Sequence, residues 1–301
     1  MLKYRIPAAL TIAALFLVAC WYDWSHGTSW AFSAFVAAGS VIVLREFYQM
    51  VEAKGARPTW GFGLLMVVLL VLGHDRWCWE KWHGLERLTP DRMMTVLAVV
   101  VLGTFLIQVL RRGPRGTILN VGSTLLGLVY VWFLPAFLVK IRHLGLRPEP
   151  GSWVTDGVEL LVLTVGLSKI ADMGAYFTGR NFGRRKLSPV LSPAKTWEGA
   201  AGGVAASIAG MFVLRAVFPE SVFGSFDVWT ALSFAILMAV GGLFGDLMAS
   251  ALKRDSGLKH SGDIVPGFGG FLDVVDSIMV AAPVAYFFLL LIGARHPEVG
   301  G

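Results

Sequence analysis

Long apolar stretches alternate with short polar ones along the whole chain. A helix that crosses the hydrocarbon core of a bilayer needs about 20 predominantly apolar residues. Nine stretches approach that length, some with help from flanking residues, and the third is the shortest and most doubtful. The pattern predicts an all-α polytopic membrane protein with about nine transmembrane helices, near residues 6–22, 29–44, 60–73, 93–110, 118–139, 157–178, 198–218, 229–250 and 271–293.

Segments that contain Pro and Gly, such as KGARPTW, RRGPRG and RPEPGSW, separate these stretches. The last of them divides the chain near residue 150. Residues 1–150 hold about five expected helices, and the sequence leaves their role open. Residues 151–301 hold about four and carry most of the polar motifs, so we expect this half to be the catalytic domain.

The composition agrees with a membrane protein. The 301 residues are 55% hydrophobic and 15% charged, whereas soluble domains carry about 25% charged residues. The net charge of +6 is typical of cytoplasmic loops that face anionic lipid. We therefore expect membrane lipids, and no nucleic acid, as partners.

The distribution of Lys and Arg predicts the orientation. With the N-terminus inside, the inner segments carry 16 of these residues and the outer segments carry 8. Because cytoplasmic loops are enriched in Lys and Arg, we expect the N-terminus in, the C-terminus out and a bacterial cytoplasmic (inner) membrane as the location. The loops 179–195 and 254–265 then share the cytoplasmic side.

The two cysteines lie near the predicted outer side. The segment LVAC, which ends at Cys20, resembles a bacterial lipoprotein cleavage site, but the many spans that follow favour a retained first helix. A disulfide between Cys20 and Cys78 and a pair of thiols both stay open.

Ionisable residues inside a span need a partner or a function. Lys169 and Asp172 are spaced i, i+3 on one predicted helix, which is close enough for them to neutralise each other. The segment AYFTGRNFG then leads into a basic loop in which backbone N–H groups and cations could hold phosphate. For Lys169 and Asp172, plain ion pairing and a functional role both stay open.

The segment SPAKTWEGAAGG predicts the start of a helix. Ser192 would cap it, Pro193 would take the first helical position and Glu198 would bond back to an early N–H. A helix N-terminus that carries Lys195 and Thr196 would bind an anion. Ordinary capping with a snorkelling lysine is the alternative.

One face of the eighth predicted helix is polar at its end. Asp246, Ser250 and Lys253 are spaced i, i+4 and i+7, which places them on the same face. An unpaired carboxylate there would cost on the order of several kcal/mol. Lys253 lies two turns from Asp246, so we expect a metal ion as the partner of this carboxylate, with a salt bridge as the alternative.

The last predicted helix begins with two carboxylates. The segment GDIVPGFGG breaks the chain, and Asp273 and Asp276 follow it on one helical face. Mg²⁺ prefers hard oxygen ligands and binds one or two carboxylates together with substrate phosphates. Lys253, Arg254 and Lys259 stand close by in the sequence and would hold a polyphosphate. The arrangement predicts phosphoryl or nucleotidyl transfer at a membrane face.

These motifs resemble the signature of the phosphatidate cytidylyltransferases, also called CDP-diacylglycerol synthases, over about residues 165–285. REFYQMVEAKGARP, from Arg45, matches more weakly. The stronger matches are D-x-x-AY-x-x-GR-x-FG from Asp172, SP-x-KT-x-EG from Ser192, S-x-x-K-R from Ser250, then Lys259, PG-x-GG from Pro266 and D-x-x-D from Asp273.

Three positions depart from the commonest form of the signature. His260 stands where an Asp usually follows the lysine, Phe268 where a His usually sits between glycines, and Val274 where an Arg usually follows the first Asp. The departures leave the three carboxylates and the main cations in place.

The resemblance implies transfer of the cytidylyl group of CTP to phosphatidate, which gives CDP-diacylglycerol and pyrophosphate. It implies Asp246 and Asp273 as Mg²⁺ ligands and as catalytic residues with Lys253, and Asp276 as a third ligand or a neighbour of the metal. A second metal ion stays open. The residues implied to bind substrate are Asp172, Tyr176, Ser192, Lys195, Thr196, Glu198, Ser250, Arg254 and Lys259.

Other functions stay open beside this one. A CTP-dependent lipid kinase of the polyprenol or phytol type would release CDP instead of pyrophosphate. A transporter would carry charges near the middle of several spans, whereas here they gather towards one face. The three departures also allow a catalytically inactive paralogue, and the sequence leaves open whether the protein forms a homodimer.

Overall fold

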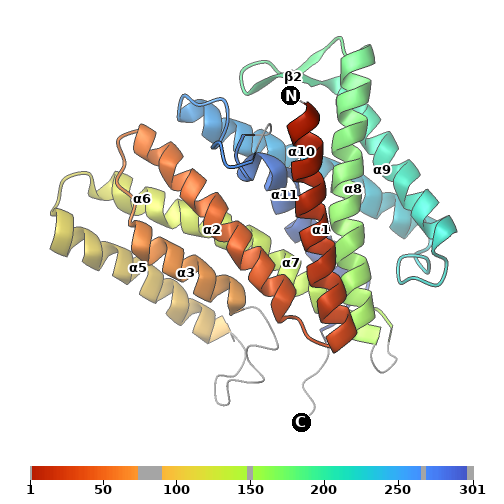
Figure 1. Ribbon diagram of the computed structural model, residues 1–301, viewed down its shortest axis with the longest axis horizontal. Coiled ribbons are helices and arrows are strands. Elements are labelled where there is room, and N and C mark those ends of the chain that lie inside the picture. Colours follow the sequence, from red (N-terminus) through yellow and green to blue (C-terminus); the bar gives the residue numbers. More distant parts are fainter. Residues whose placement is uncertain (1, 74–89, 148–151, 266–268, 297–301) are drawn as a thin grey trace. The chain divides into compact units, whose positions relative to one another are not determined.

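The computed structural model describes residues 2–73, 90–147, 152–265 and 269–296. Within these residues, eight helical segments are long and apolar enough to cross a membrane, and one shorter apolar helix is α3, Trp60–Leu72. Figure 1 shows that helices make up almost all of the described chain. The prediction of an all-α, multi-pass membrane protein is therefore confirmed, and the shortest expected span is the one whose helix, α3, is shorter than the eight long segments.

The chain forms two compact units that exchange segments of sequence. The first unit contains Met1–Val139 and Leu252–Val274, and the second contains Lys140–Ala251 and Val275–Gly301. The motif-bearing loop after residue 252 thus packs with the N-terminal helices. The division at residue 150 into a helical half of open role and a catalytic half stays a prediction.

The first unit is a group of packed helices. Helix α2 packs against α1, α3 and α6, and α5 packs against α6. Helix α6 continues through the π-helical turn η1 into α7. The bounds are α1 Leu2–His26, α2 Trp30–Ala53, α3 Trp60–Leu72, α5 Pro90–Arg112, α6 Thr117–Leu128, η1 Val129–Phe133 and α7 Leu134–Arg142.

A buried carboxylate fixes the turn between α1 and α2. Asp23 is fully buried and accepts hydrogen bonds from the N–H groups of Phe32, at 2.8 Å, and Ala31, at 3.2 Å. The hydroxyl of Thr28 also donates to it, at 2.8 Å. These bonds satisfy first-turn N–H groups that have no partner within the helix.

The second unit contains the remaining helices and one hairpin. Its bounds are α8 Ser152–Phe182, β1 Lys186–Ser188, β2 Ser192–Thr196 and α9 Trp197–Val217, followed by α10 Val228–Asp255 and α11 Leu272–Leu291, which each have one end in the first unit. Helices α8 and α9 pack along their length. Small residues allow this, because a Cβ atom on Gly203 would lie 3.1 Å from the Cβ of Ala175.

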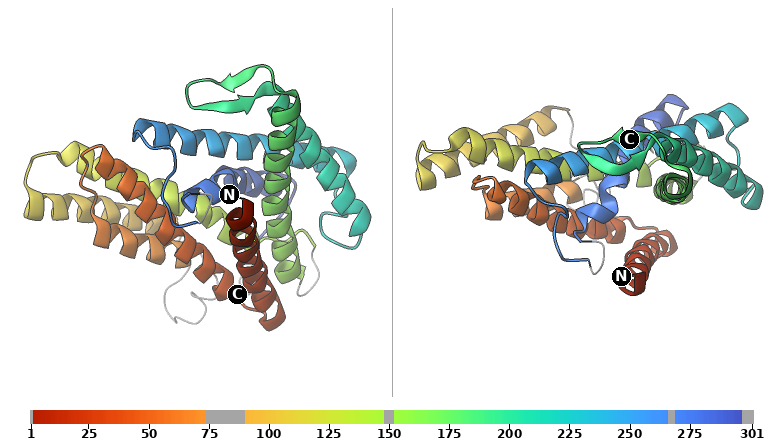
Figure 2. Two further views of the ribbon diagram at one scale, coloured as in Figure 1. Left: turned by 45° about the horizontal axis from the view of Figure 1, so that its top comes forward. Right: turned by 90° about the horizontal axis from the view of Figure 1, so that it is seen from above.

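The predicted span 198–218 begins within one residue of α9, but the predicted cap of this helix is wrong. Ser192 does not cap a helix but begins β2, which pairs with β1 in an antiparallel hairpin. The cap is Thr196, whose hydroxyl accepts the N–H of Gly199 at 3.1 Å. Pairing with β1 holds Pro193 and its neighbours in extended backbone. Figures 1 and 2 show the hairpin beyond the end of α8.

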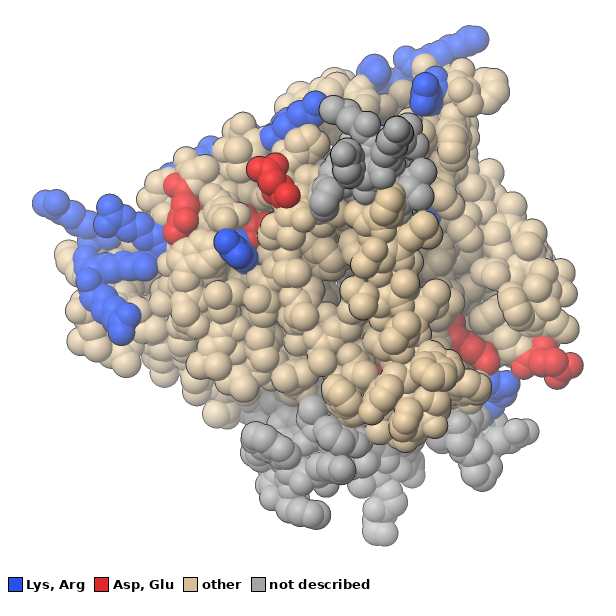
Figure 3. Space-filling model, viewed as in Figure 1, with Lys and Arg blue, Asp and Glu red and all other residues tan. Residues whose placement is uncertain are grey.

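Contacts between loops show which of them share a side within the first unit. Arg112, at the end of α5, donates to the carbonyl of Pro58 in the loop between α2 and α3, at 3.1 Å. In that loop, the ammonium of Lys54 pairs with Asp255, at the end of α10, at 3.1 Å. These loops all belong to the predicted inner set. Figure 3 shows Lys and Arg side chains gathered where α5 meets α6, which is where Arg111, Arg112 and Arg115 lie.

The second unit brings together loops of the predicted outer set. Gly145 and Arg295 form an antiparallel bridge, and the carbonyl of Glu220 accepts a hydrogen bond from Arg147 at 3.2 Å. The observed contacts join inner loops to inner loops and outer loops to outer loops, as the sequence predicts. Which set faces the cytoplasm stays a prediction. Cys78 lies outside the described residues, and α1 runs unbroken through Cys20.

Candidate active site

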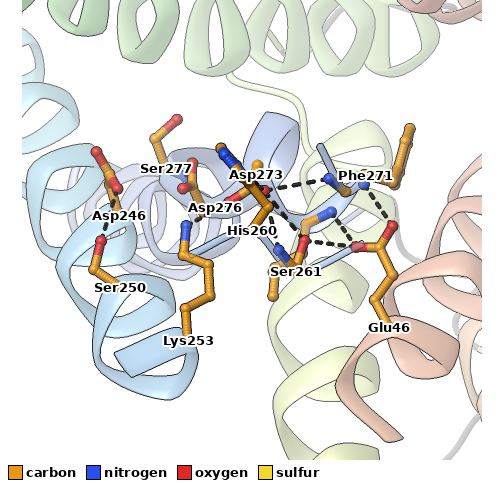
Figure 4. Close-up of polar contacts among 12 residues, drawn as sticks. Glu46, Asp246, Ser250, Lys253, His260, Ser261, Phe271, Asp273, Asp276 and Ser277 are labelled. Atoms are coloured by element: carbon orange, nitrogen blue, oxygen red, sulfur yellow. Dashed lines mark hydrogen bonds and ion pairs between the residues drawn. The ribbon is translucent and has the colours of Figure 1, made fainter. Parts of the chain in front are cut away.

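A buried ion pair joins α10 to α11 within the first unit. The ammonium of Lys253 pairs with the carboxylate of Asp273, and each side chain is only 11% exposed. Asp273 also accepts the backbone N–H groups of Ser261 and Gly270, both at 3.2 Å. Figure 4 shows these donors around one carboxylate. Two of the three predicted catalytic residues are therefore in direct contact.

A residue without a predicted role completes this cluster. Glu46 of α2 is fully buried, and its carboxylate accepts the N–H groups of Phe271, at 2.6 Å, and Leu272, at 2.9 Å. The hydroxyl of Ser261 donates to it as well, at 2.9 Å. The signal in the sequence is an acidic residue near the end of an apolar run, which needs a buried partner. Its partners lie too far along the chain for a pattern to reveal them.

A second ion pair lies in the second unit. The ammonium of Lys195 on β2 is 2.7 Å from the carboxylate of Asp246 on α10. It also donates to the carbonyl of Leu243 at 3.4 Å, and the hydroxyl of Ser250 donates to Asp246 at 3.4 Å. The salt bridge that the sequence left as the alternative for Asp246 is present, and the hairpin supplies its cation, Lys195. A metal ion as a further partner of Asp246 stays a prediction. Asp246 remains 36% exposed.

Lys169, Asp172 and Ser277 form a closed triangle of contacts between α8 and α11. The ammonium of Lys169 lies 3.2 Å from Asp172 and 2.8 Å from the hydroxyl of Ser277, which itself donates to Asp172 at 2.8 Å. The predicted pairing at i, i+3 is confirmed. A role of Asp172 or of the exposed Tyr176 in binding substrate stays a prediction.

The other predicted ligands surround these contacts along the chain. Glu198 accepts the backbone N–H groups of Arg184 at 3.0 Å and Arg185 at 3.2 Å, so it orders the basic loop before the hairpin. Arg254 and Lys259 are exposed at and beyond the end of α10. Asp276 is 6% exposed, so it is much less accessible than Asp246.

The two ion pairs share helix α10, which carries Asp246 of one pair and Lys253 of the other. Asp246 and Lys253 are two turns apart on one face of α10, and Asp273 and Asp276 are one turn apart on α11. Within the second unit these helices approach closely, because a Cβ atom on Gly245 would lie 3.2 Å from the Cα of Ser277. A larger residue than Gly245 would push the two helices apart.

The oxygen donors of these helices suit a hard divalent cation. Among the described residues, however, no three carboxylate, His or Cys side chains gather at one point. Mg²⁺ commonly binds one or two carboxylates and completes its coordination with water and substrate phosphates. Asp246 and Asp273 each offer one such carboxylate within their own unit. Their joint binding of Mg²⁺, with or without Asp276, stays a prediction.

One departure from the family signature lies directly beside the buried pair. The Nδ1 atom of His260 is 3.8 Å from the carboxylate of Asp273. Val274, the second departure, follows Asp273 on α11 and is partly buried, and Phe268 lies outside the described residues. An imidazole therefore stands near Asp273 where the common signature has an acid.

Comparison with known proteins shows the family of the chain. The model of the cytidylyltransferase family matches residues 3–292. A phosphatidate cytidylyltransferase of Synechocystis sp. is 31% identical over 95% of this chain and 98% of its own. One of Thermotoga maritima is 30% identical over 95% of each chain. The chloroplastic phosphatidate cytidylyltransferase 5 of Arabidopsis thaliana is 31% identical over 88% of this chain and 67% of its own.

The fold and the polar groups thus define a multi-pass membrane protein with lysine–carboxylate pairs on its C-terminal motifs. The chain belongs to the cytidylyltransferase family, whose members are nucleotidyl-transferring enzymes.

Proposed function

We propose that the protein transfers the cytidylyl group of CTP to phosphatidate, forming CDP-diacylglycerol and pyrophosphate. The observation that carries the proposal is that the family motifs hold two lysine–carboxylate pairs, Lys253 with Asp273 and Lys195 with Asp246. Relatives named phosphatidate cytidylyltransferase, which align with almost the whole chain, support both substrates.

The reaction places its main demands on charge and alignment. A phosphate oxygen of phosphatidate attacks the α-phosphorus of CTP, and the bond to the bridging oxygen breaks, so that pyrophosphate leaves. The attacking phosphate is already anionic near neutral pH, so a general base is not needed. The protein must instead align the two phosphates and neutralise their charge.

The two lysines suit this task in different ways. An ammonium group has three donors, so it can hold a carboxylate and a phosphate at the same time. Lys253 is nearly buried. Its ammonium group therefore lies in surroundings of low dielectric, where a fixed cation stabilises negative charge most strongly. Lys195 is somewhat more exposed. Arg254 and Lys259, which are exposed, would meet the polyphosphate first as it arrives from water.

Asp246 and Asp273 would hold Mg²⁺ together with oxygens of the substrate phosphates. The bound ion would supply further neutralisation of charge on the transferring oxygens. Ser250 donates to Asp246, while Ser261 and Gly270 donate to Asp273, so each carboxylate is oriented by donors of its own unit.

We further propose that the N-terminus lies in the cytoplasm and the C-terminus outside, in a bacterial cytoplasmic membrane. The charge bias and the shared sides of the inner loops support this orientation. CTP then reaches the exposed cations from the cytoplasm, and phosphatidate arrives from within the bilayer.

The test follows the label of CTP. Purified protein is incubated with phosphatidate, Mg²⁺ and CTP labelled either at the α-phosphorus or at the γ-phosphorus. The proposal predicts that the α-label enters a lipid and the γ-label leaves as pyrophosphate. Transfer of the γ-label to a lipid, with release of CDP, would establish a lipid kinase instead.

A further inference from the structure

Glu46 lies on α2, in the weakly matching segment REFYQMVEAKGARP and far in the sequence from the stronger motifs that carry the proposed reaction. We infer that Glu46 is a positioning residue for that reaction, because its carboxylate fixes the start of α11 and, through it, Asp273. This inference rests on the proposed cytidylyl transfer.

Burial and three hydrogen bonds hold the Glu46 carboxylate in one position. It is fully buried, and its three donors are the N–H groups of Phe271 and Leu272 and the hydroxyl of Ser261. Leu272 is the first residue of α11, Leu272–Leu291, and Phe271 directly precedes it. The helix dipole also favours a negative charge at this end. The Glu46 carboxylate therefore holds the start of this helix.

Ser261 links Glu46 to the proposed metal ligand. Its hydroxyl lies 2.9 Å from Glu46 and 3.4 Å from Asp273, and its backbone N–H donates to Asp273 at 3.2 Å. Figure 4 shows Ser261 between the two carboxylates. Asp273 also follows Leu272 directly in the chain, so a shift of the helix start moves Asp273 with it.

Close packing leaves this cluster little room to rearrange. A Cβ atom on Gly262 would lie 3.2 Å from the Cγ of Glu46, and one on Gly39 would lie 3.0 Å from the ring of Phe271. A shorter or neutral side chain at position 46 therefore cannot recover the three bonds by a small movement. Glutamine keeps the shape but turns an NH₂ group toward one of the N–H donors.

Asp23 provides a matched control within the same unit. It too is fully buried and accepts N–H groups at the start of a helix, those of Phe32 and Ala31 in α2. Within the described part of the chain, the hydrogen bonds of Asp23 go to Thr28, Ala31 and Phe32, none of which belongs to a motif of the site. A purely structural role of Glu46 predicts the same behaviour for Glu46→Gln and Asp23→Asn.

The experiment compares Glu46→Gln, Asp23→Asn and the unaltered protein, each purified in full length. Hydrogen–deuterium exchange of the segment 269–274 is measured without substrate. The concentration of Mg²⁺ for half-maximal activity and kcat are then measured with CTP and phosphatidate. For Glu46→Gln we expect exchange at least tenfold faster, a Mg²⁺ requirement at least fivefold higher and a kcat at least tenfold lower. For Asp23→Asn we expect a lower Tm and none of these changes.

Each result decides one part of the inference. Unchanged exchange in Glu46→Gln would overturn the anchoring of α11, and faster exchange with an unchanged Mg²⁺ requirement and kcat would overturn the positioning of Asp273. If the unaltered protein has no activity, the proposed function fails while the exchange result still decides the anchoring. If Glu46→Gln does not fold, Ser261→Ala takes its place. For this variant we expect exchange of segment 269–274 to be at least twofold faster and the Mg²⁺ requirement to be at least twofold higher. No change in either quantity would overturn the inference.

Discussion

The ammonium of Lys195 lies 2.7 Å from the carboxylate of Asp246, so the β1–β2 hairpin supplies the cation for a carboxylate on α10. The side chain of Lys195 is 17% exposed and that of Asp246 is 36% exposed, so solvent partly screens the pair, and we expect it to stabilise the fold by about 1 kcal/mol or less. The pair therefore has little structural value, which favours a role in binding substrate.

Substitution of Lys195 tests that role. Lys195→Met removes the cation and keeps most of the side-chain volume. We expect the KM for CTP to rise at least tenfold and the Tm to change by no more than about 2 °C, because the lost pair contributes little stability. The control is Lys186→Met in β1 of the same hairpin, an exposed position, which should leave both quantities unchanged. An unaltered KM in Lys195→Met would remove Lys195 from the proposed site.

The pair of Lys253 and Asp273 should behave differently, because both side chains are nearly buried. Lys253→Met leaves a buried carboxylate without its cation, which costs about 3–5 kcal/mol. We expect a marked fall in Tm and loss of activity. In the double variant Lys253→Met/Asp273→Asn the charge imbalance is gone, so part of the stability should return while activity stays absent. A double variant that recovers activity would show that neither residue takes part in the reaction.

The orientation is testable with single cysteines. In a background of Cys20→Ser and Cys78→Ser, Val190→Cys and Ile264→Cys place thiols in the two loops of the proposed inner side, and Glu220→Cys places one in an outer loop. These positions are exposed. In intact cells, an impermeant thiol reagent should label only Glu220→Cys. Labelling of Val190→Cys or Ile264→Cys would contradict the orientation.

The spans were predictable because hydropathy depends only on local composition. Every apolar run corresponds to an observed helix, and the doubtful third run is α3, with 13 residues. At a rise of 1.5 Å per residue, this helix covers about 20 Å, less than the roughly 30 Å of a bilayer core. Its start lies with the inner loops in the first unit, as the contact of Pro58 with Arg112 shows.

The site was predictable only where its residues share a helix. The spacing of Asp246, Ser250 and Lys253 was enough to place them on one face of α10. The partner of Asp246 was not predictable, because it comes from a hairpin with two short strands. The partners of Glu46 were not predictable either, because they lie more than 200 residues further along the chain. Such contacts depend on how helices pack, and no local pattern records them.

The most direct measurement is the rate of cytidylyl transfer by Asp246→Asn, taken together with its thermal stability. Asn keeps the shape of Asp and removes one charged ligand from the transferring phosphates. Because Asp246 is 36% exposed, its pair contributes little to the fold, so the Tm should stay within about 2 °C of that of the unaltered protein. The loss of about 3 kcal/mol of transition-state stabilisation should lower kcat/KM for CTP by more than a hundredfold. A stable Asp246→Asn protein that makes CDP-diacylglycerol at a near-normal, Mg²⁺-dependent rate would contradict the account.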